Sequence, residues 1–510
     1  MKLSCIHECN VLDVLSEARR SRSSSTSSYH GGTDEQEHDL EGTDEQERDL
    51  EGTMDPTLKA IVNAIADAGG KCLLVGGFVR DRLIGNKASK DIDIEVYGLS
   101  YEDLVRQLSL FGKPKTVGKS FGVVKLAVDG EDYDFSLPRR DSKVSEGHKG
   151  FTVATDQNLT PAEAALRRDF TMNSVAEDAD GNLIDPFGGA KDIEDGILRA
   201  TSEHFAEDPL RVLRGFQFAA RFDMTVEEKT AAMCTQLKDE FQTLPKERVW
   251  TEFEKFCTKA AKPSAGITFL KDTKWLELFP NVATMHDSPQ DSEWHPEGCV
   301  LTHTEHCMDA AVKIADREDV QGEDRTVLML AVMCHDIGKP ATLAKNESGR
   351  WTNKKHANVG VPIAKDFLES IGAHSRIIKR VLPLVSEHMA LLDVRPEDIS
   401  ETQVRRLSRR LGDATISELV NVMEADASGR PPLPKGRPKG AQMILMIAKE
   451  LEIQDSKPKP ILMGRHLVSM GMSPGPNFSE ILKAAYDAQL GGEFSDLNSA
   501  LQWVKRAAGQ

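Results

Sequence analysis

The spacing of apolar residues changes along the chain and divides it into a mixed part and a helical part. Apolar positions three or four residues apart predict helices over residues 57–68 and 101–110. Short apolar or alternating runs predict strands over residues 73–75, around Asp93, over 122–128, over 133–137 and over 181–185. From about Asp192 onward the spacing is almost wholly helical. We therefore expect an α+β fold in which a small mixed sheet with helices is followed by all-α domains.

The stretch from Leu73 to Gly98 combines two features that suit phosphate and metal chemistry. A Gly76-Gly77 turn lets the backbone approach a ligand and expose its N–H groups. Asp91 and Asp93 point to the same side of a strand, where two carboxylates repel each other unless a cation such as Mg²⁺ lies between them. Each feature alone is more often a plain turn or a solvated edge. Together, about fifteen residues apart, they indicate metal-assisted nucleotidyl transfer.

Two further sets of residues extend this candidate site. If the strands at 122–128 and 133–137 form a hairpin beside Asp91 and Asp93, they bring in Asp134 as a third carboxylate; a solvated strand residue is the alternative. Asp208, Arg211 and Arg214 recur every three residues where a helix opens, with Pro209 in its first turn, so they share one helix face. A plain surface ion pair is the alternative for that face.

Composition limits the class of protein. With 510 residues, 39% apolar and 28% charged, the chain fits a globular protein of two to four domains. We expect no transmembrane helix and no secretory signal. The eight cysteines contain no paired CxxC set, which argues against a zinc ribbon or a disulfide framework and favours a reducing compartment. The expected location is cytoplasmic, with organelle import as the alternative because residues 19–28 are rich in Arg and Ser.

The net charge of −17 argues against a generally basic nucleic-acid binder, although a basic strip on an acidic enzyme still suffices for RNA. Residues 1–53 carry −8 of this charge and include a tandem repeat, GTDEQEHDLE then GTDEQERDLE. Such a polar segment cannot bury a core, so we expect it to be a disordered tail.

Five blocks then occur in order over residues 73–259: VGGFVRD, KDIDIEV, RRDFTMNS, LIDPFGG and EDPLRVLRGFQFAARF. They resemble the signatures of class II tRNA nucleotidyltransferases (CCA-adding enzymes) and of the related bacterial poly(A) polymerases. The resemblance implies a polymerase-beta-like head at 54–200 and a helical, RNA-binding neck at 201–285. It also implies CTP, ATP and tRNA as partners, and Mg²⁺ at the transferase site.

The same resemblance implies a role for each matching residue. Gly76, Gly77 and Arg80 belong to the triphosphate turn, Asp91 and Asp93 hold two Mg²⁺ ions, and Asp134 is the third carboxylate. Arg168 contacts the incoming nucleotide. Asp208 and Arg211 form the amino-acid template for C or A, because a guanidinium and a carboxylate supply donors and acceptors to a base edge. Arg214 belongs to the same pocket. Gln217 stands where the family often has another Arg, so one contact loses its charge.

A second motif follows the neck. A lone His is more often packed or exposed than a ligand, but His335-Asp336 after an apolar helix suits a transition metal or Mg²⁺. The pattern over residues 290–430 resembles the HD-domain metal-dependent phosphohydrolases. This resemblance implies His303, His335, Asp336 and Asp426 as ligands, His356 and His388 as candidates for a second metal, and Lys339 as a phosphate contact. His306 and His374 are interpreted as structural.

The expected organisation is therefore a tail at 1–53, a head at 54–200, a neck at 201–285, an HD domain at 286–430 and a linker with a small helical module at 431–510. The helix at 403–411 carries four arginines and is either a solvated face or part of a tRNA-binding strip. The leading hypothesis is CCA addition to tRNA with a second, phosphohydrolase activity. The alternatives are a poly(A) polymerase, an HD phosphohydrolase whose head only holds RNA, and a non-catalytic RNA-binding protein. The sequence indicates no oligomeric state.

Overall fold

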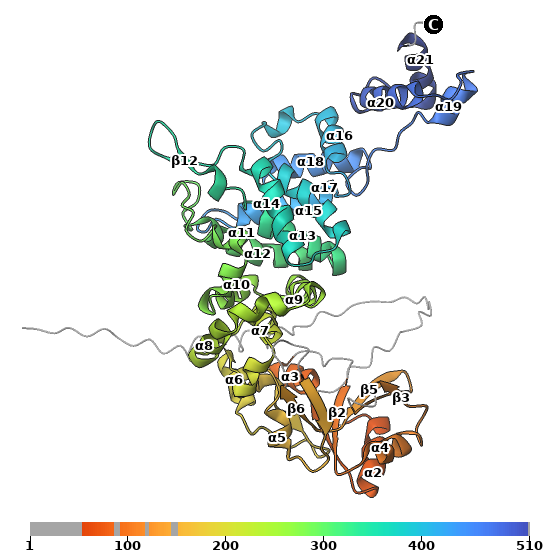
Figure 1. Cartoon of the computed structure of the whole chain (residues 1–510). Coiled ribbons are helices and arrows are strands. Elements are labelled where there is room, and N and C mark those ends of the chain that lie inside the picture. The colour runs from red at the N-terminus through yellow and green to blue at the C-terminus, as the bar shows by residue number, and fades with distance from the viewer. Residues whose placement is uncertain (1–53, 86–91, 118–121, 144–150, 508–510) are drawn as a thin grey trace, which may run out of the picture. The chain divides into compact units, whose positions relative to one another are not determined.

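The computed structural model describes residues 54–85, 92–117, 122–143 and 151–507. Asp91 and the expected tail at 1–53 lie outside the described residues. The structure is mixed α+β near its beginning and helical afterwards, as the apolar spacing predicts (Figure 1).

The head is built on one seven-stranded sheet with the order β3-β4-β5-β2-β1-β8-β9. Its strands are β1 (Lys71–Val75), β2 (Ile92–Tyr97), β3 (Lys115–Val117), β4 (Val123–Val128), β5 (Glu131–Ser136), β8 (Ala176–Glu177) and β9 (Leu183–Ile184). β2 and β5 pair in parallel, whereas the other neighbours are antiparallel, so the sheet is mixed. A separate hairpin joins β6 (Arg139–Lys143) to β7 (Phe151–Thr155).

The two faces of the sheet are covered differently. Helices α2 (Pro56–Asp67) and α4 (Tyr101–Leu108) bury their apolar sides in a core that includes Leu74 and Ile94. The residues between these, such as Leu73 and Tyr97, pack in a smaller cluster on the other face. This alternation follows from the period of two along a strand. Asp93 and Glu95 are therefore on the face of Tyr97, away from α2 and α4.

The remaining elements of the head follow short turns. Helix α3 (Gly77–Ile84) begins directly after β1, with Gly76 before it, and α5 (Pro161–Ala165) starts at a capping box formed by Thr160 and Glu163. Helix α6 (Gly189–Asp195) and the short 3-10 helix η2 (Thr171–Asn173) follow.

Aromatic side chains form the core of the neck. Helices α7 (Leu210–Phe222), α9 (Lys246–Lys259) and α10 (Pro263–Asp272) pack against one another. Phe216 of α7 stacks on Phe256 of α9 with ring centroids 4.3 Å apart and also meets Phe253. Because Gly215 leaves no side chain there, the ring of Phe269 from α10 approaches α7 closely. Helix α8 (Glu228–Gln236) completes the neck.

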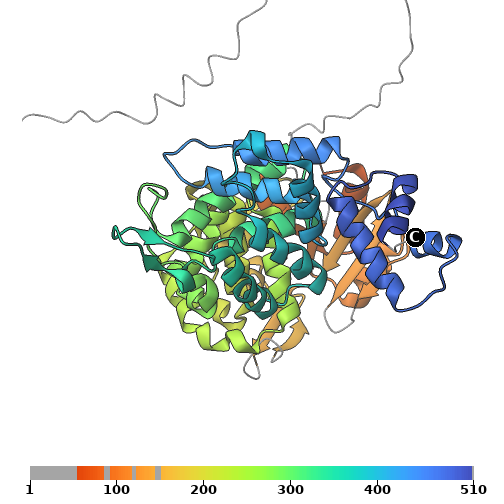
Figure 2. The same cartoon turned by 90° about the horizontal axis from the view of Figure 1, so that it is seen from above.

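The HD region consists of α12 (Val300–Arg317), α13 (Gly322–Cys334), α14 (His356–Ser370), α15 (Ser375–Glu387) and α17 (Ile416–Ser428). Helix α13 is buried along almost its whole length, and α12, α15 and α17 all pack against it. These helices lie together in both views (Figures 1 and 2). A central buried helix explains why the sequence VLMLAVMC is apolar on every side.

The last part of the chain contains α16 (Glu401–Arg410) and α18 (Lys439–Glu450), followed by α19 (Gly464–Ser469), α20 (Asn477–Leu490) and α21 (Leu497–Ala507). The final three helices share a small core of their own that includes Leu467, Ala485 and Val504. Within the described ranges, every helix is too short or too polar to serve as a membrane-spanning segment.

The strands expected at 122–128 and 133–137 form a hairpin, β4–β5, which lies beside β2 because β5 pairs with β2 in parallel. Asp134 is thereby brought next to Asp93, as expected. Two other expectations about local structure need correction. The polar, glycine-containing sequence at 141–150 predicts a loop, but its first three residues belong to strand β6, which extends to Lys143. Asp208 precedes α7 with an extended backbone instead of lying within the helix, since Pro209 occupies the cap position.

Candidate functional site

Asp93 and Asp134 stand side by side on neighbouring strands. They are register partners in the parallel pair of β2 and β5, so their side chains emerge on the same face. Asp93 is exposed, and Asp134 receives the Lys125 ammonium at 2.6 Å from its Oδ2 atom. This end of the sheet therefore offers carboxylate oxygens to a cation from the solvent side.

The glycine turn lies directly against these carboxylates. Val75 is the register partner of Asp93, so the next residue, Gly76, lies beside the Asp93 side chain. Gly76 has φ of +73°, and a Cβ atom added there would lie 3.3 Å from Asp93 Oδ2 and 3.7 Å from Arg168 Nη1. Both the backbone angle and the space favour glycine.

Arg80 lies on α3, one helical turn after the glycine turn. Its guanidinium is buried, forms an ion pair with Asp81 at 2.7 Å and donates to Asn173 Oδ1 at 2.8 Å. Burial lowers the pKa of Arg80, and Asp81 partly offsets this effect. A Cβ atom at Gly77 would lie 3.4 Å from Arg80 Nη2. Arg80 thus supports the turn from inside the protein.

Glu95 is a site residue that the sequence analysis missed. Its side chain is only 3% exposed. The carboxylate accepts hydrogen bonds from Arg167 Nη2 at 3.2 Å and from the Tyr97 hydroxyl at 2.7 Å. Arg168 Nη2 lies 3.8 Å from the other carboxylate oxygen. The alternation Asp91, Asp93, Glu95 was the signal that could have revealed it, because residues two apart share a strand face.

A second buried carboxylate, Asp169, connects the head to the neck. It accepts from Arg214 Nε at 2.7 Å, from the Asn173 amide at 2.9 Å and from the Phe170 N–H at 2.8 Å. Burial alone would raise the pKa of Asp169, but Arg214 and these hydrogen bonds lower it to about 2. Arg214 also lies over the Phe218 ring. Arg214 is expected at the site from the sequence, whereas Asp169 is not.

The residues of the expected base-selecting pocket lie close together at the start of α7. Arg211 donates to the backbone carbonyls of His204 and Arg167, each at 2.6 Å. Asp208 accepts from the Leu210 N–H at 3.0 Å. Gln217 is buried, and its amide oxygen has no hydrogen-bond partner among the described residues.

The second candidate site is in the HD region, where four histidines present the same ring atom to one place. The Nδ1 atoms of His335, His356 and His388 lie 2.6–2.8 Å from the backbone carbonyls of Val332, Asn353 and Val385. His303 Nδ1 lies 3.2 Å from the Gly429 carbonyl and 2.7 Å from Glu297. A carbonyl can only accept, so Nδ1 carries the proton in each ring. Each ring therefore turns Nε2 toward the cluster, where a metal would bind that nitrogen in its deprotonated form.

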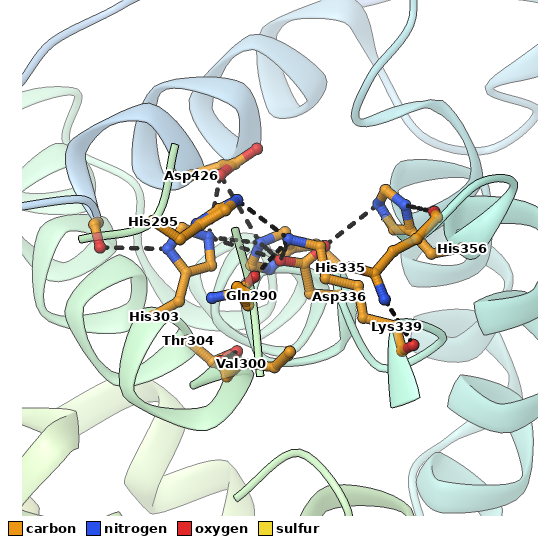
Figure 3. A network of polar contacts seen from close by, with 12 residues as sticks. Gln290, His295, Val300, His303, Thr304, His335, Asp336, Lys339, His356 and Asp426 are labelled. Atoms are coloured by element: carbon orange, nitrogen blue, oxygen red, sulfur yellow. Dashed lines mark hydrogen bonds and ion pairs between the residues drawn. The ribbon is translucent and has the colours of Figure 1, made fainter. Parts of the chain in front are cut away.

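Asp336 lies between two groups of these imidazoles. Its Oδ2 atom is 3.2 Å from His335 Nε2 and 3.6 Å from His303 Nε2. Its Oδ1 atom is 3.2 Å from His356 Nε2 and 3.8 Å from His388 Nε2. Figure 3 shows His303 and His356 on opposite sides of Asp336. One carboxylate therefore faces both candidate metal positions.

The side chains around His303 come from helices that are far apart in the sequence. His303 Nε2 is 3.1 Å from Asp426 Oδ1, which joins α12 to α17. The candidate metal-binding groups among the described residues are His303, Cys307, His335 and Asp426; His295, Glu297 and His303; and Asp336, His356 and His388. All six ligands predicted from the HD resemblance are thus brought together, and Cys307, His295 and Glu297 are additions.

Burial and neighbouring charges shift the pKa values of several residues in this cluster. Burial alone would lower the pKa of His335, but Asp336 raises it to about 10. Burial and the neighbouring His335 lower the pKa of His388 to about 4. Burial opposes ionisation of Glu297, whereas its hydrogen bonds with His295 and His303 lower its pKa to about 2. The histidine pKa values thus shift in opposite directions, whereas the pKa values of the carboxylates Glu297, Asp336 and Asp426 are all lowered, so the cluster presents ionised carboxylates to a positive ion.

Lys339 is next to this cluster and has three polar neighbours. Its Nζ atom is 2.7 Å from Asp336 Oδ2, 2.8 Å from Gln290 Oε1 and 3.4 Å from His295 Nε2. Figure 3 shows all of these side chains around the histidine cluster. Gln290 had no signal in the sequence, because it comes from an irregular segment before α12.

The other positions named from the sequence are His306, His374 and the arginines of α16. His306 is exposed on α12, and His374 packs edge-on against Trp250. In α16, Arg405 pairs with Glu401, Arg409 with Asp487 and Arg410 with Glu387. These carboxylates favour the interpretation of α16 as a solvated face. The six cysteines in the described part of the chain are all free, as expected.

Family models match the head, the neck and the HD region of this chain. Residues 72–199 match the Poly A polymerase head domain, residues 223–285 match the model described as "Probable RNA and SrmB- binding site of polymerase A", and residues 300–428 match the HD domain. The multifunctional CCA protein of Xanthomonas campestris is 32% identical over 427 residues, which cover 81% of this chain and 97% of that protein. The multifunctional CCA protein of Xylella fastidiosa is 34% identical over 369 residues, covering 71% and 80%.

This chain belongs to the multifunctional CCA protein family. It is a nucleotidyltransferase that carries an HD domain, as the order of its motifs predicts, and the alternative functions are not favoured. Solved structures share the multifunctional CCA fold. The Bacillus stearothermophilus CCA-adding enzyme in complex with CTP matches with a TM-score of 0.60 and 20% identity over 89% of this chain and 98% of that one. The Thermotoga maritima CCA-adding enzyme complexed with tRNA matches with a TM-score of 0.56 and 20% identity, covering 90% and 97%.

Proposed function

We propose that this chain adds CCA, or part of it, to the 3′ ends of tRNA from CTP and ATP without a nucleic-acid template. The observation that carries the proposal is the position of Asp93 and Asp134 side by side next to the Gly76 turn and Arg168. Relatives that are 32% and 34% identical to this chain are named multifunctional CCA proteins. Solved structures of the same fold were obtained with CTP, with ATP and with tRNA.

The donor set of the head fits Mg²⁺. Asp93 and Asp134 offer hard carboxylate oxygens on one face, and Asp134 already accepts a cation, the Lys125 ammonium. Together with Asp91, these residues would hold the ions. When bound, Mg²⁺ supplies charge stabilisation to the leaving pyrophosphate and lowers the pKa of the primer 3′-hydroxyl.

The protein's own contribution is positioning. Gly76 leaves room for the triphosphate beside Asp93, and Arg168, held by Glu95, donates to its oxygens. Arg211 and Asp208 select the base through hydrogen bonds to its edge, and Arg211 exchanges its backbone carbonyl partners for the base when it does so. Positioning and charge account for most of the catalysis in phosphoryl-group chemistry of this kind.

A direct assay tests this proposal. Purified protein is given a tRNA that lacks its 3′ end, with CTP alone, ATP alone or both, and the products are sequenced. We expect CCA with both nucleotides and a shortened product with CTP alone. A long A tail would support a poly(A) polymerase instead, and absence of incorporation at every Mg²⁺ concentration would overturn the proposal.

The HD region supports a second activity, hydrolysis of phosphomonoesters or 2′,3′-cyclic phosphates. The specific observation is the convergence of four Nε2 atoms on Asp336 and Asp426. These donors fit divalent transition metals, which when bound supply an activated water and charge stabilisation. Lys339 and His295 would orient the phosphate, since Lys339 pairs with Asp336 and His295 lies next to Lys339.

A pair of histidines on one helix gives the matched test. His303→Ala removes a candidate ligand, whereas His306→Ala alters an exposed histidine three residues later on α12. We expect the first variant to lose metal-dependent hydrolysis and the second to retain it, with CCA addition normal in both. Equal hydrolysis by the two variants would place the activity elsewhere.

A further inference from the structure

Cys307 lies inside the histidine cluster of the HD region. It is one turn after His303 on α12, it is fully buried, and its Sγ atom is 3.3 Å from His303 Nε2. The same nitrogen is 3.1 Å from Asp426 Oδ1 and 3.4 Å from His335 Nε2. The donor atoms of Cys307, His303, His335 and Asp426 all lie within 4.8 Å of one another.

These separations suit a single metal centre. In a tetrahedral zinc site the metal is about 2.0–2.1 Å from nitrogen and about 2.3 Å from sulfur, which places neighbouring donors roughly 3.3–3.7 Å apart. Four separations between donor atoms of these residues run from 3.1 to 3.9 Å. An ion at the centre of the group therefore reaches all four donors with only small side-chain movements.

The surroundings of the sulfur explain why it points into the cluster. A Cβ atom at Gly429 would lie 2.2 Å from Cys307 Sγ, so glycine at that position is what leaves room for the thiol. The Gly429 carbonyl is also 3.2 Å from His303 Nδ1. The start of the segment after α17 thus holds both the imidazole and the sulfur against the site.

A buried cysteine often serves only as a small apolar residue. Cys334 provides that comparison in this chain, because it is fully buried next to His335 and yet belongs to none of the candidate metal groups among the described residues. Cys307 differs in what its sulfur faces, namely the two imidazoles and the carboxylate of the cluster.

We infer that Cys307 is a thiolate ligand of the metal held by His303, His335 and Asp426, and that this position takes a divalent transition metal such as zinc instead of Mg²⁺. Thiolate favours soft and borderline metals, whereas Mg²⁺ prefers oxygen. Binding replaces the S–H bond by a metal–sulfur bond and releases the proton to solvent. The second group, Asp336, His356 and His388, has no sulfur among its described ligands. The inference rests on the proposed metal-dependent function of the HD region.

The most direct test is X-ray absorption at the zinc edge of the full-length protein. Cys5 and Cys9 are replaced by Ser in every sample, because thiols elsewhere in the chain would also bind zinc. We expect one sulfur scatterer at about 2.3 Å together with nitrogen and oxygen at about 2.0–2.2 Å. A zinc-loaded protein with nitrogen and oxygen scatterers alone would overturn the inference and leave the proposed function intact. Failure to retain any zinc would overturn both.

Variants give an independent readout. In the cobalt-substituted protein, thiolate ligation produces a sulfur-to-cobalt charge-transfer band in the near ultraviolet. We expect Cys307→Ser to lose this band and to bind zinc at least about tenfold more weakly in competition with a chelator. Cys334→Ser is the matched control and keeps the band. Persistence of the band in folded Cys307→Ser protein would overturn the inference; if that variant does not fold, the absorption measurement on unaltered Cys307 decides.

Discussion

Asp93 and Asp134 are register partners across the parallel strands β2 and β5. Residues paired in this way project on the same face of a sheet, so two carboxylates separated by forty residues of chain become neighbours. The Lys125 ammonium that reaches Asp134 at 2.6 Å partly neutralises this negative face. We expect Mg²⁺ to compete with that ammonium when nucleotide binds.

Asp93→Asn and Asp134→Asn should each reduce the turnover of nucleotide addition by about a thousandfold or more, because several kcal/mol of charge stabilisation depend on these oxygens. Asp132→Asn is the matched control, since it lies on the same face of β5 and is the register partner of Ala127. The measurement is single-turnover addition of CMP to a truncated tRNA. Normal turnover in Asp93→Asn would show that the metal site is misplaced.

Glu95→Gln should impair nucleotide binding without removing a residue that touches the nucleotide. Loss of one charge weakens the hold on Arg167 and Arg168, and we expect the KM for CTP and for ATP to rise about tenfold, since a charge-assisted hydrogen bond contributes roughly 1.5–3 kcal/mol. The kcat at saturating nucleotide should change much less.

The control for Glu95 is Glu177→Gln. Glu177 is also buried, on strand β8 of the same sheet, and pairs with Arg82 at 2.9 Å. If both substitutions raise KM alike, Glu95 acts through the stability of the head and not through the position of Arg168.

Arg211→Ala should relax the choice of base. Removing the guanidinium removes donors that a base edge requires, so we expect CTP and ATP to lose about 10–100-fold of their advantage over UTP and GTP, equivalent to roughly 1–3 kcal/mol. The ratio of kcat/KM values for the four nucleotides measures this effect. Arg221→Ala serves as a comparison, because Arg221 is on the same helix but pairs with Asp81. Unchanged ratios in Arg211→Ala would assign base selection to other residues.

Asp169 should make the junction of head and neck sensitive to acid. Its pKa is lowered to about 2 in the folded protein, against about 3.9 in an unfolded chain. A lowered pKa means that the ionised form stabilises the fold above about pH 4, and that this contribution is lost as the pH falls from about 4 towards 2. The loss should amount to roughly 2–3 kcal/mol.

Urea unfolding at a series of pH values tests this linkage. Asp169→Asn should be less stable than the unaltered protein at neutral pH, and the difference should shrink in the acid range. Asp195→Asn is the control, because Asp195 is an exposed partner of Lys191. A constant difference between the two proteins at all pH values would show that Asp169 does not supply the titrating contact.

Most elements of the head could be predicted from the sequence because their signals are local. The helix expected at 57–68 is α2, and the strands expected at 122–128 and 133–137 are β4 and β5. Glu95 and Asp169 were missed because a buried carboxylate looks the same in a sequence as an exposed one. What distinguishes them is the arginine that each one meets, and those arginines come from other elements.

The sequence by itself determined the order of the parts, the α+β class and the chemical types at each site, because apolar periodicity and motif spacing depend on neighbours along the chain. Only the tertiary structure decided which residues act together. The parallel pairing of β2 with β5 set Asp134 beside Asp93, and the packing of α12 and α17 around α13 set Cys307 and Asp426 beside His335. These contacts join positions far apart in the chain, and their register depends on how whole helices and strands pack.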